Sequence, residues 1–345
     1  MHVRKPQGVT IRAIAKRLGL SPSTVSVALR DGRRGAFVSQ ETRSIVHETA
    51  RAMGYSLERL RSPRAQLLQV ALFCPSSNPR DLLQHTTVVK LCHLLSQQGF
   101  RALVHISEDR RKACEAARRL HQRHQADGVI FVGSRSDPAE LDVGDVPFVV
   151  IGEVPEDGKV WQVHLDNEAG GRAVGEHLWG LGHRKVGVVM PLGNPSAKHK
   201  RLRGLRSVWD GRGEEFPDDR VLWVLEEYEQ GVMEHLGSFL DDNERRGDRL
   251  TALFCFDDRV AAYVLRALRE RGMQVPRDIS VAGFDNDPYA EVMDPPLTTV
   301  HQPFPELATL AAQLLQDRLR SEPAPAKVLT LAGQLIVRES TAPPP

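Results

Sequence analysis

The strongest constraint on the fold is the regular alternation of apolar runs with helix-like stretches through the body of the chain, residues 68–340. The apolar runs are short and almost continuous, and they occupy residues 67–73, 101–106, 128–132, 148–152, 185–190, 221–225, 252–256 and 279–284. Segments that read as helices separate them. This pattern predicts parallel sheets with helices on both faces, and such sheets bind ligands at the carboxyl ends of their strands.

The same body lacks the motifs of common enzyme classes. No GxGxxG follows the first apolar run and no GxxxxGK[ST] occurs, so nucleotide-cofactor chemistry is not indicated. No arrangement of Ser, His and Asp stands out as a catalytic triad, and His121 and His124 have no further metal ligands in view. The four cysteines lack paired spacing and are expected to be reduced thiols. We therefore expect a protein without catalytic residues, metal or cofactor.

The N-terminus has no apolar segment of the kind found in signal peptides. MHVRKPQG opens the chain, and no apolar run of 18 residues occurs anywhere in the sequence. A cytoplasmic protein without a membrane partner is expected.

The N-terminal segment carries most of the surplus positive charge. Residues 1–64 hold thirteen Lys and Arg against four Asp and Glu, which leaves 33 basic and 40 acidic residues for the rest of the chain. A basic head on an acidic body indicates that the head binds a polyanion, whereas a solvated basic tail is the plain alternative.

Helical patterns in this segment favour a folded head that binds a polyanion. In the first predicted helix Thr10 is the N-cap, Ile11, Ile14, Ala15 and Leu18 share one face, and Gly19 ends the pattern. Ser21 caps a second helix with Pro22 in its first turn; Val25, Ala28 and Leu29 face inward, and Ser23, Ser26, Val27 and Arg30 face outward. A third helix opens at Ser39, buries Ile45, Val46, Ala50 and Met53, and ends at Gly54. The positions of Ala15, Gly19 and Val25 match a helix-turn-helix.

A longer series of residues gives this head a family resemblance. The series comprises Val9-Thr10-Ile11, Ile14-Ala15, Leu20-Ser21, Thr24-Val25-Ser26, Val38-Ser39, Glu41-Thr42-Arg43 and Met53-Gly54-Tyr55. It resembles the head of a lactose-repressor (LacI/GalR) family regulator, whose second helix enters the major groove. The resemblance implies that Pro22, Ser23 and Val27 face base edges, while Thr10, Ser21, Thr24 and Ser26 hold phosphates. Arg30 is a further implied DNA contact. Arg33 and Arg34 in the following loop are expected to contact phosphates, with solvated loop charges as the plain alternative.

Two segments depart from the family pattern. Val27 stands where family members often carry Arg or His, so we expect apolar contact with a thymine methyl instead of a bidentate bond to guanine. The linker 56–67 is expected to act as a hinge, but Pro63 would interrupt the hinge helix that the family forms on DNA. Leu60 is the candidate for the leucine that wedges into the minor groove.

The body extends the resemblance. It contains Asp166-Asn167, Gly170-Gly171, Leu181-Gly182-His183-Arg184, Arg201-Leu-Arg-Gly204, the run 275–285, Pro296-Leu-Thr-Thr-Val300 and Val337-Arg338-Glu-Ser-Thr341. These residues look like the family's effector domain, a two-lobed α/β fold of the periplasmic-binding-protein type. By analogy, the first lobe is about 68–181 plus 303–325, the second is about 182–300 plus 326–340, residues 1–55 are the head, and 341–345 are a tail.

The resemblance also implies an effector between the lobes, a sugar or sugar derivative by family default and a nucleobase as the alternative. Arg201 and Asp285 match the family residues that hold the ligand, and Asp257 matches a polar position. Phe304 and Tyr228 would supply apolar walls, and Ser76 would contact the ligand from the first lobe. The plainer alternatives are that Asp257 caps a helix and that Phe304 belongs to the core.

Two-fold symmetry follows from the size of the head. One helix-turn-helix reads few base pairs, so a homodimer on pseudo-palindromic double-stranded operator DNA is expected, and the tail lacks a leucine heptad for tetramers. The resulting prediction is a ligand-controlled transcriptional repressor in the bacterial cytoplasm. A ligand-binding protein with a non-functional head is the rival reading.

Overall fold

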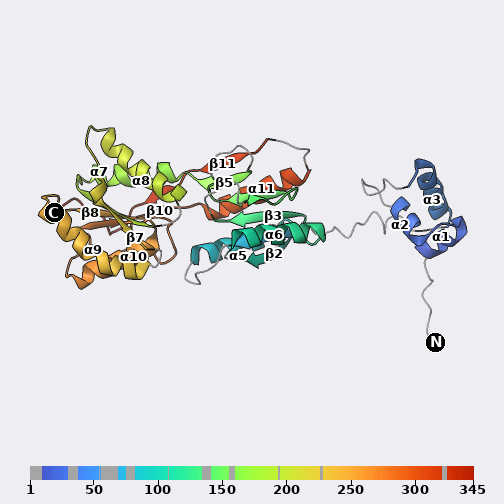
Figure 1. Cartoon of the computed structure of the whole chain (residues 1–345), viewed down its shortest axis with the longest axis horizontal. Helices are drawn as coiled ribbons and strands as arrows, with labels where there is room; N and C mark the ends of the chain where they lie inside the picture. Colours follow the sequence, from blue (N-terminus) through green and yellow to red (C-terminus); the bar gives the residue numbers. More distant parts are fainter. Residues whose placement is uncertain are drawn as a thin grey trace, which may run out of the picture. The chain divides into compact units, whose positions relative to one another are not determined.

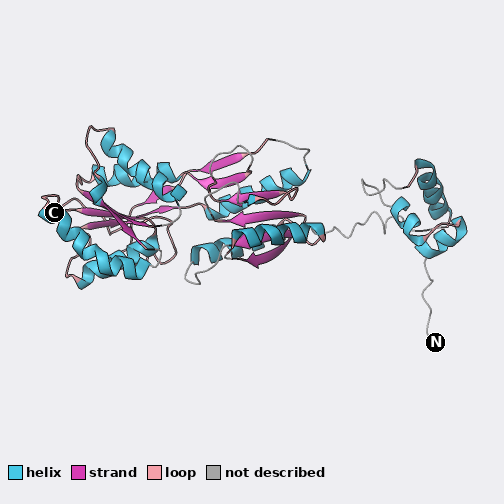
Figure 2. Ribbon diagram, viewed as in Figure 1, coloured by secondary structure: helices cyan, strands magenta, loops and turns pink. Residues whose placement is uncertain are grey.

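The computed structural model describes residues 10–29, 38–53, 55, 69–74, 82–107, 109–133, 141–154, 160–192, 195–225, 228–320 and 325–345. The chain divides into two compact units, Met1–Leu68 and Gln69–Pro345. Figure 1 labels many of the elements of both units, and Figure 2 distinguishes helices from strands by colour.

Three helices form the N-terminal unit: α1 (Ile11–Leu18), α2 (Pro22–Leu29) and α3 (Gln40–Ala52). The predicted caps are present, because the Thr10 side chain accepts from the Ala13 N–H and the Ser39 side chain from the Thr42 N–H. Gly19 ends α1 in the left-handed region, with φ of 64°. The Thr24 N–H donates to Ser21 Oγ at 3.0 Å, so Ser21 caps α2 as the sequence predicts.

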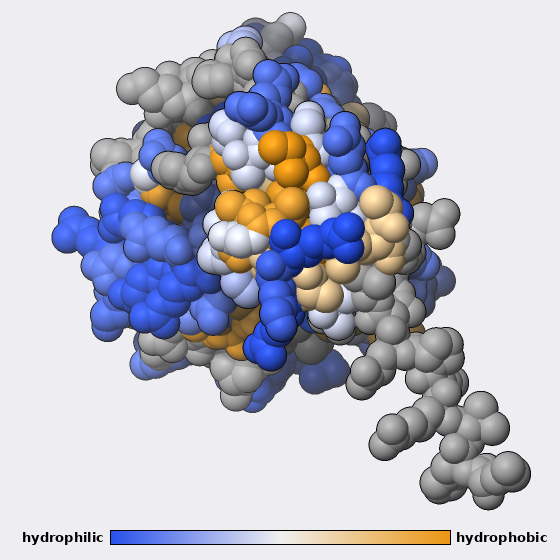
Figure 3. All heavy atoms as spheres, turned by 90° about the vertical axis from the view of Figure 1, so that its right-hand side faces the viewer, coloured by the Kyte–Doolittle hydropathy of each residue, from blue (hydrophilic) through white to orange (hydrophobic). Residues whose placement is uncertain are grey.

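The core of this unit matches the predicted inward faces except at one position. Ile14, Ala15, Val25, Ala28, Leu29, Val46 and Ala50 are buried together. Ile45 was expected in this core, but 46% of it is exposed, which contradicts the prediction. Residues 46, 50 and 53 already share the inward face at helical spacing, and Ile45 is turned about 100° away from Val46. On the face drawn in Figure 3, hydrophobic residues gather in a central area bordered by hydrophilic ones.

The second unit contains a six-stranded parallel sheet of order β11-β5-β4-β3-β1-β2. Its strands are β1 (Gln69–Cys74), β2 (Arg101–Ile106), β3 (Gly128–Val132), β4 (Phe148–Ile151), β5 (Gln162–Leu165) and β11 (Val328–Leu331). Helices α5 (Leu82–Gln97) and α11 (Phe304–Arg320) pack on one face, and α6 (Arg110–Gln122) packs on the other. The inner strands β1, β3 and β4 are almost entirely apolar because both of their faces are buried.

A four-stranded parallel sheet of order β7-β6-β8-β9 forms the second lobe of this unit. Its strands are β6 (Val186–Pro191), β7 (Val221–Val224), β8 (Ala252–Cys255) and β9 (Ser280–Ala282). Helices α7 (Asn167–Gly180) and α8 (Pro195–Asp210) cover one face; α9 (Tyr228–Arg245) and α10 (Asp258–Glu270) cover the other. The short 3-10 helix η3 (Asp218–Arg220) precedes β7. The predicted alternation of strands and helices is confirmed.

The connections between the lobes differ from the expected boundaries at two elements. Helix α7 was expected in the first lobe, but its Val174 and Leu178 belong to the core of the second. Strand β11 was expected in the second lobe, yet it pairs with β5 in the first sheet. The antiparallel strands β10 (Thr299–His301) and β12 (Gln334–Ile336) carry the chain between the lobes.

The first residues of the predicted tail, 341–345, are bound to the second lobe. His177 Nε2 lies 2.9 Å from Thr341 Oγ1, and His183 Nε2 lies 2.8 Å from the Ala342 carbonyl oxygen. The Val281 N–H donates to the Ser340 carbonyl oxygen at 2.8 Å, so Ser340 lies beside β9. Within the described residues, no helix is long and apolar enough to cross a bilayer.

Candidate functional site

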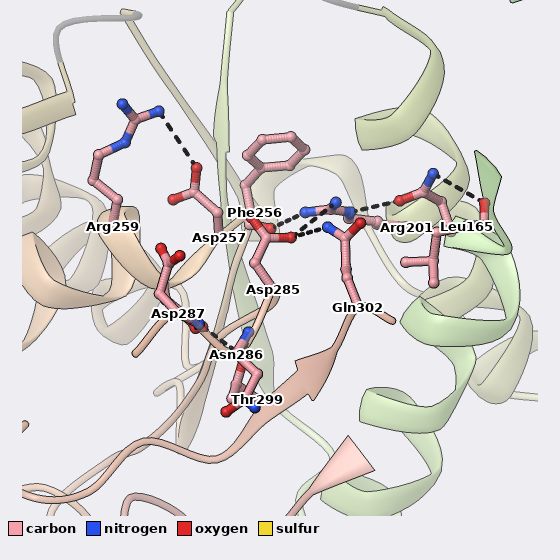
Figure 4. Close-up of polar contacts among 12 residues, drawn as sticks. Leu165, Arg201, Phe256, Asp257, Arg259, Asp285, Asn286, Asp287, Thr299 and Gln302 are labelled. Atoms are coloured by element: carbon pink, nitrogen blue, oxygen red, sulfur yellow. Dashed lines mark hydrogen bonds and ion pairs between the residues drawn. The ribbon is translucent and has the colours of Figure 1, made fainter. Parts of the chain in front are cut away.

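Charged side chains gather at the carboxyl ends of β8 and β9, the edge of the second sheet where parallel α/β folds bind ligands. Asp257 and Asp258 follow β8, Asp285 and Asp287 follow β9, and all four are buried. Arg201 reaches the same place from α8. Figure 4 shows Arg201, Asp285 and Gln302 pointing toward one another.

Arg201 is held on every side by the second lobe. Nε donates to Asn167 Oδ1 at 2.9 Å, Nη1 donates to the Phe256 carbonyl oxygen at 2.5 Å, and Nη2 lies 3.3 Å from Asp285 Oδ1. The guanidinium carbon lies 3.6 Å from the centre of the Phe284 ring. Burial lowers the pKa of Arg201, and the neighbouring Asp285 opposes that shift. The plane of the guanidinium is therefore fixed in advance of any ligand.

Asp285 joins the second lobe to the segment that crosses to the first. Its carboxylate accepts from Arg201 and from Gln302 Nε2, and Gln302 directly follows the crossing strand β10. The backbone of Asp285 pairs with His301 of that strand. Asp285 and Asn286 both have positive φ, 103° and 54°, a conformation that non-glycine residues rarely adopt and that recurs at functional sites.

Asp257 fits both roles that the sequence allows, the helix cap and the effector-binding carboxylate. Its side chain is the N-cap of α10, accepting from the Val260 N–H at 2.7 Å, and Arg259 Nη2 lies 3.6 Å from Oδ2. Burial raises the pKa of Asp257 to about 6, against the lowering effect of Arg259. The carboxylate thus has a structural role that does not exclude a second one.

Asp258 was not predicted as a site residue; with Asp257 it was expected only as a possible helix cap. It is fully buried, accepts from Thr299 Oγ1 at 2.6 Å and accepts from the Asp287 N–H at 2.7 Å. Burial, followed by the charge of Asp285, raises its pKa to about 8. Asp258 therefore connects the end of β8 with the loop after β9 and with β10. Only its place beside Asp257 at a strand end pointed toward this role.

A close helix crossing sets the position of Arg201. A Cβ atom at Gly171 would come within 3.0 Å of the Arg201 backbone, and one at Gly204 would come within 3.0 Å of the Glu168 carbonyl oxygen. Glycines at both contacts allow α7 and α8 to approach closely. This approach brings Asn167 of α7 to Arg201. Asn167 and Gln302 were not predicted as site residues, although Asn167 lies in a motif that the sequence reading noted.

Of the remaining predicted effector residues, Phe304 is the one whose side chain the structure describes. Phe304 begins α11 and packs, half-buried, against the core of the first lobe, in line with its plainer alternative. Tyr228 begins α9, but its side chain lies outside the described residues, as does Ser76.

The predicted DNA-binding residues fall partly on described helices. Thr10, Ser21 and Pro22 are exposed at the N-termini of α1 and α2, whereas Thr24, Ser26 and Val27 are half-buried along α2. The side chain of Ser23 lies outside the described residues, and so do Arg30, Arg33, Arg34 and Leu60 with the whole linker around Pro63.

Comparison with known proteins agrees with this architecture. A family model described as a periplasmic binding protein-like domain matches residues 175–341. The helix-turn-helix-type transcriptional regulator DegA of Bacillus subtilis is 28% identical, covering 97% of this chain and 98% of its own length. The regulator CelR of Thermobifida fusca is 29% identical, covering 96% of this chain and 98% of its own length. This chain is similar to LacI-family transcriptional regulators over nearly its full length.

Solved structures extend the likeness to the fold of the whole chain. A complex of CelR with cellobiose superimposes with a TM-score of 0.70 at 26% identity, covering 96% of this chain and 99% of that one. A LacI-family regulator from Enterococcus faecium with bound ribose gives a TM-score of 0.68 at 26% identity, over 80% and 99%. The relatives are regulators of transcription, and this chain resembles them over nearly its full length.

Proposed function

We propose that this chain is a LacI-family repressor whose operator affinity changes when a sugar binds between the lobes at Arg201 and Asp285. The observation that carries the proposal is the buried Arg201–Asp285 pair at the carboxyl ends of β8 and β9. Its donors and acceptors suit a ligand with several hydroxyl groups, because a guanidinium donates in a fork and a carboxylate accepts.

The relatives support a sugar as the ligand class. CelR is solved with cellobiose and the Enterococcus faecium regulator with ribose. In this chain Arg201, Asp257 and Asp285 supply polar groups, and the ring of Phe256, whose centre lies 4.5 Å from the Arg201 guanidinium carbon, supplies an apolar surface beside them. Fixed polar groups next to an aromatic ring are the usual composition of a small-molecule site.

The contacts around Asp285 provide a route from ligand to lobe movement. Gln302 leads into α11 of the first lobe, and the Asp166 N–H donates to the Leu331 carbonyl oxygen at 2.7 Å, across the start of α7 and the end of β11. Lys200 of α8 forms an ion pair with Glu153, which follows β4. A ligand that engages Asp285 competes with Gln302 and shifts the balance between two lobe arrangements.

The DNA-binding part of the proposal rests on the head. Ser21 and Thr24 hydroxyls, 2.8 Å apart at the start of α2, suit phosphate contacts that fix the orientation of the helix in the major groove. Phosphate neutralisation makes binding fall steeply with salt. A head that has lost DNA binding would show no such dependence.

A homodimer completes the proposal, with β2 as part of its interface. Leu103, Val104 and Ile106 of this edge strand are exposed. Edge strands normally carry charges that block pairing, so an apolar edge favours association with a second copy.

The test combines operator selection with ligand titration on the full-length protein. Operators selected from a random duplex pool are titrated in the presence of glucose, galactose, xylose, their disaccharides, hypoxanthine and guanine. We expect one saccharide to change operator affinity at least tenfold, and Arg201→Ala to remove that response while operator binding persists. A response to a nucleobase alone would replace the sugar with the alternative effector. Absence of salt-dependent DNA binding would refute the regulator's DNA-binding role.

A further inference from the structure

We propose that the effector site extends along the carboxyl edge of the second sheet to Trp223, and that it takes a saccharide of at least two rings. This inference rests on the proposed sugar effector. It assigns Trp223 and Lys198 to a second subsite that holds the ring beyond Arg201 and Asp285.

The register of the strands places Trp223 in one row with the aromatic rings beneath Arg201. Trp223 of β7 pairs with Met190 of β6, and Val189 pairs with Cys255 of β8, so Phe256 is level with Met190. Phe254 pairs with Ala282 of β9, which brings Phe284 to the same level. Residues level with one another in a parallel sheet point to the same face. Met190 and Phe284 belong to the core beneath α7 and α8, so this is the face that α8 covers.

Two cations from α8 lie over this row, one toward each end. Lys198 Nζ lies 5.3 Å from the centre of the Trp223 ring, while the Arg201 guanidinium carbon lies 4.5 Å from the Phe256 ring and 3.6 Å from the Phe284 ring. Lys198 is only 5% exposed, and its ammonium group donates to the Pro191 carbonyl oxygen, at the end of β6, at 3.1 Å. From β7 to β9, the edge therefore presents first Trp223 with Lys198 and then Phe256 and Phe284 with Arg201.

Trp223 is the solvent-exposed residue at one end of the row. It is 37% exposed on the edge strand β7, whereas Phe284 is fully buried and Trp161 and Trp209 are 2% and 0% exposed. The ring of His199 lies 6.0 Å away. Indole rings combine a large rigid apolar face with a polar N–H, which suits the alternating C–H and O–H groups of a sugar ring.

The dimensions of the row fit more than one ring. Three strand spacings separate β7 from β9, roughly 14 Å at the usual spacing of neighbouring strands. One ring at Arg201 and Asp285 would leave Trp223 and Lys198 for the next. An ammonium group has three donors, which suits hydroxyl acceptors on that second ring. The chemical class is therefore an oligosaccharide, with its first ring held by polar groups and its second stacked on Trp223.

The experiment compares mono- and disaccharide binding to the full-length protein by calorimetry. The probes are glucose, galactose and xylose, with cellobiose, maltose, lactose and xylobiose. We expect one disaccharide to bind at least tenfold more tightly than its component monosaccharide. Trp223→Ala should remove that advantage while changing monosaccharide affinity less than twofold, and Trp223→Phe should retain most of it. Leu225→Ala, an equally apolar change at a side chain that is 60% exposed just past the same strand, is the matched control and should bind like the wild type.

The possible results separate this inference from the proposed function. If Trp223→Ala binds the disaccharide as tightly as the wild type, or loses both ligands equally, the second subsite is wrong and the sugar effector stands. Disaccharides that bind the wild type no more tightly than monosaccharides would also exclude the second subsite. If no saccharide binds the wild type, the sugar effector itself is wrong and the subsite falls with it.

Discussion

Arg201 Nη2 lies 3.3 Å from Asp285 Oδ1, and the two side chains are 5% and 9% exposed. Removing two charges from water costs much of what their attraction returns, so such a pair is seldom kept for stability alone. This one is completed by hydrogen bonds from Arg201 to Asn167 and from Gln302 to Asp285. A preorganised pair of this kind is suited to binding, because the ligand does not have to order the side chains that hold it.

Arg201→Ala should destabilise the second unit by about 3–5 kcal/mol, because it leaves Asp285 buried without its counter-charge. Arg201→Lys should recover little, since one ammonium group cannot span Asn167, the Phe256 carbonyl and Asp285 in the plane that the guanidinium occupies. Urea denaturation of the single variants and of Arg201→Ala/Asp285→Ala measures the coupling. Strictly additive losses would show that the pair does not interact.

Gly204→Ala should displace α8 from α7 and weaken effector binding at least tenfold, because the added Cβ would meet the Glu168 carbonyl oxygen. Gly180→Ala is the control, since nothing lies within 4 Å of a Cβ at that position of α7. Alanine there should leave stability unchanged or raise it by up to about 1 kcal/mol. Thermal unfolding and ligand titration of both variants test the claim, and equal behaviour would contradict it.

Stability should fall as pH rises through the range set by Asp258. Its folded pKa of about 8 exceeds the ordinary 3.8, so the folded state binds more protons than the unfolded state between these values. Asp257, with a folded pKa of about 6, adds to this loss of stability over the lower part of the pH range. We expect the Tm to drop by a few degrees from pH 5.5 to pH 8, and Asp258→Asn to reduce that drop.

The control for the pH experiment is Asp142→Asn, which neutralises a carboxylate whose side chain is 75% exposed. This variant should keep the wild-type slope. A wild-type Tm that rises steadily between pH 5.5 and pH 8 would mean that Asp258 is ionised in the folded protein.

Val104→Glu should dissociate the proposed dimer by placing a charge on the exposed edge strand β2. Val292→Glu introduces the same charge at a side chain that is 76% exposed in the second lobe, and it should leave the oligomeric state unchanged. Sedimentation velocity distinguishes the two. Operator affinity should fall with dimer dissociation, since each head then reads a single half-site. A monomeric wild type, or two variants that sediment alike, would exclude β2 from the interface.

Local signals in the sequence were sufficient to predict most elements. The strand run 128–132 matches β3 because strands buried in parallel sheets are apolar and bounded by turns. Thr10, Ser21 and Ser39 were identified as caps because their chemistry is local. Arg201, Asp257 and Asp285 do lie together, as the family resemblance implied.

Features that depend on distant contacts were not predictable. The pairing of β11 with β5 and the packing of α7 on the second lobe are decided by chain crossings, which hydrophobic periodicity does not encode. Asn167 and Gln302 approach the site only after α7 and β10 are in position. Ile45 was misassigned because its helix is only partly covered, and one residue of error in a helical face moves a side chain to solvent.

The central claim is that ligand binding at Arg201 and Asp285 controls operator affinity. The most direct measurement is fluorescence anisotropy of a labelled, selected operator bound by the full-length protein, titrated with the saccharide that calorimetry shows to bind. The account predicts at least a tenfold change in operator affinity for the wild type and no change for Arg201→Ala. An operator affinity that the bound saccharide leaves unchanged in the wild type, or changes equally in Arg201→Ala, would contradict it.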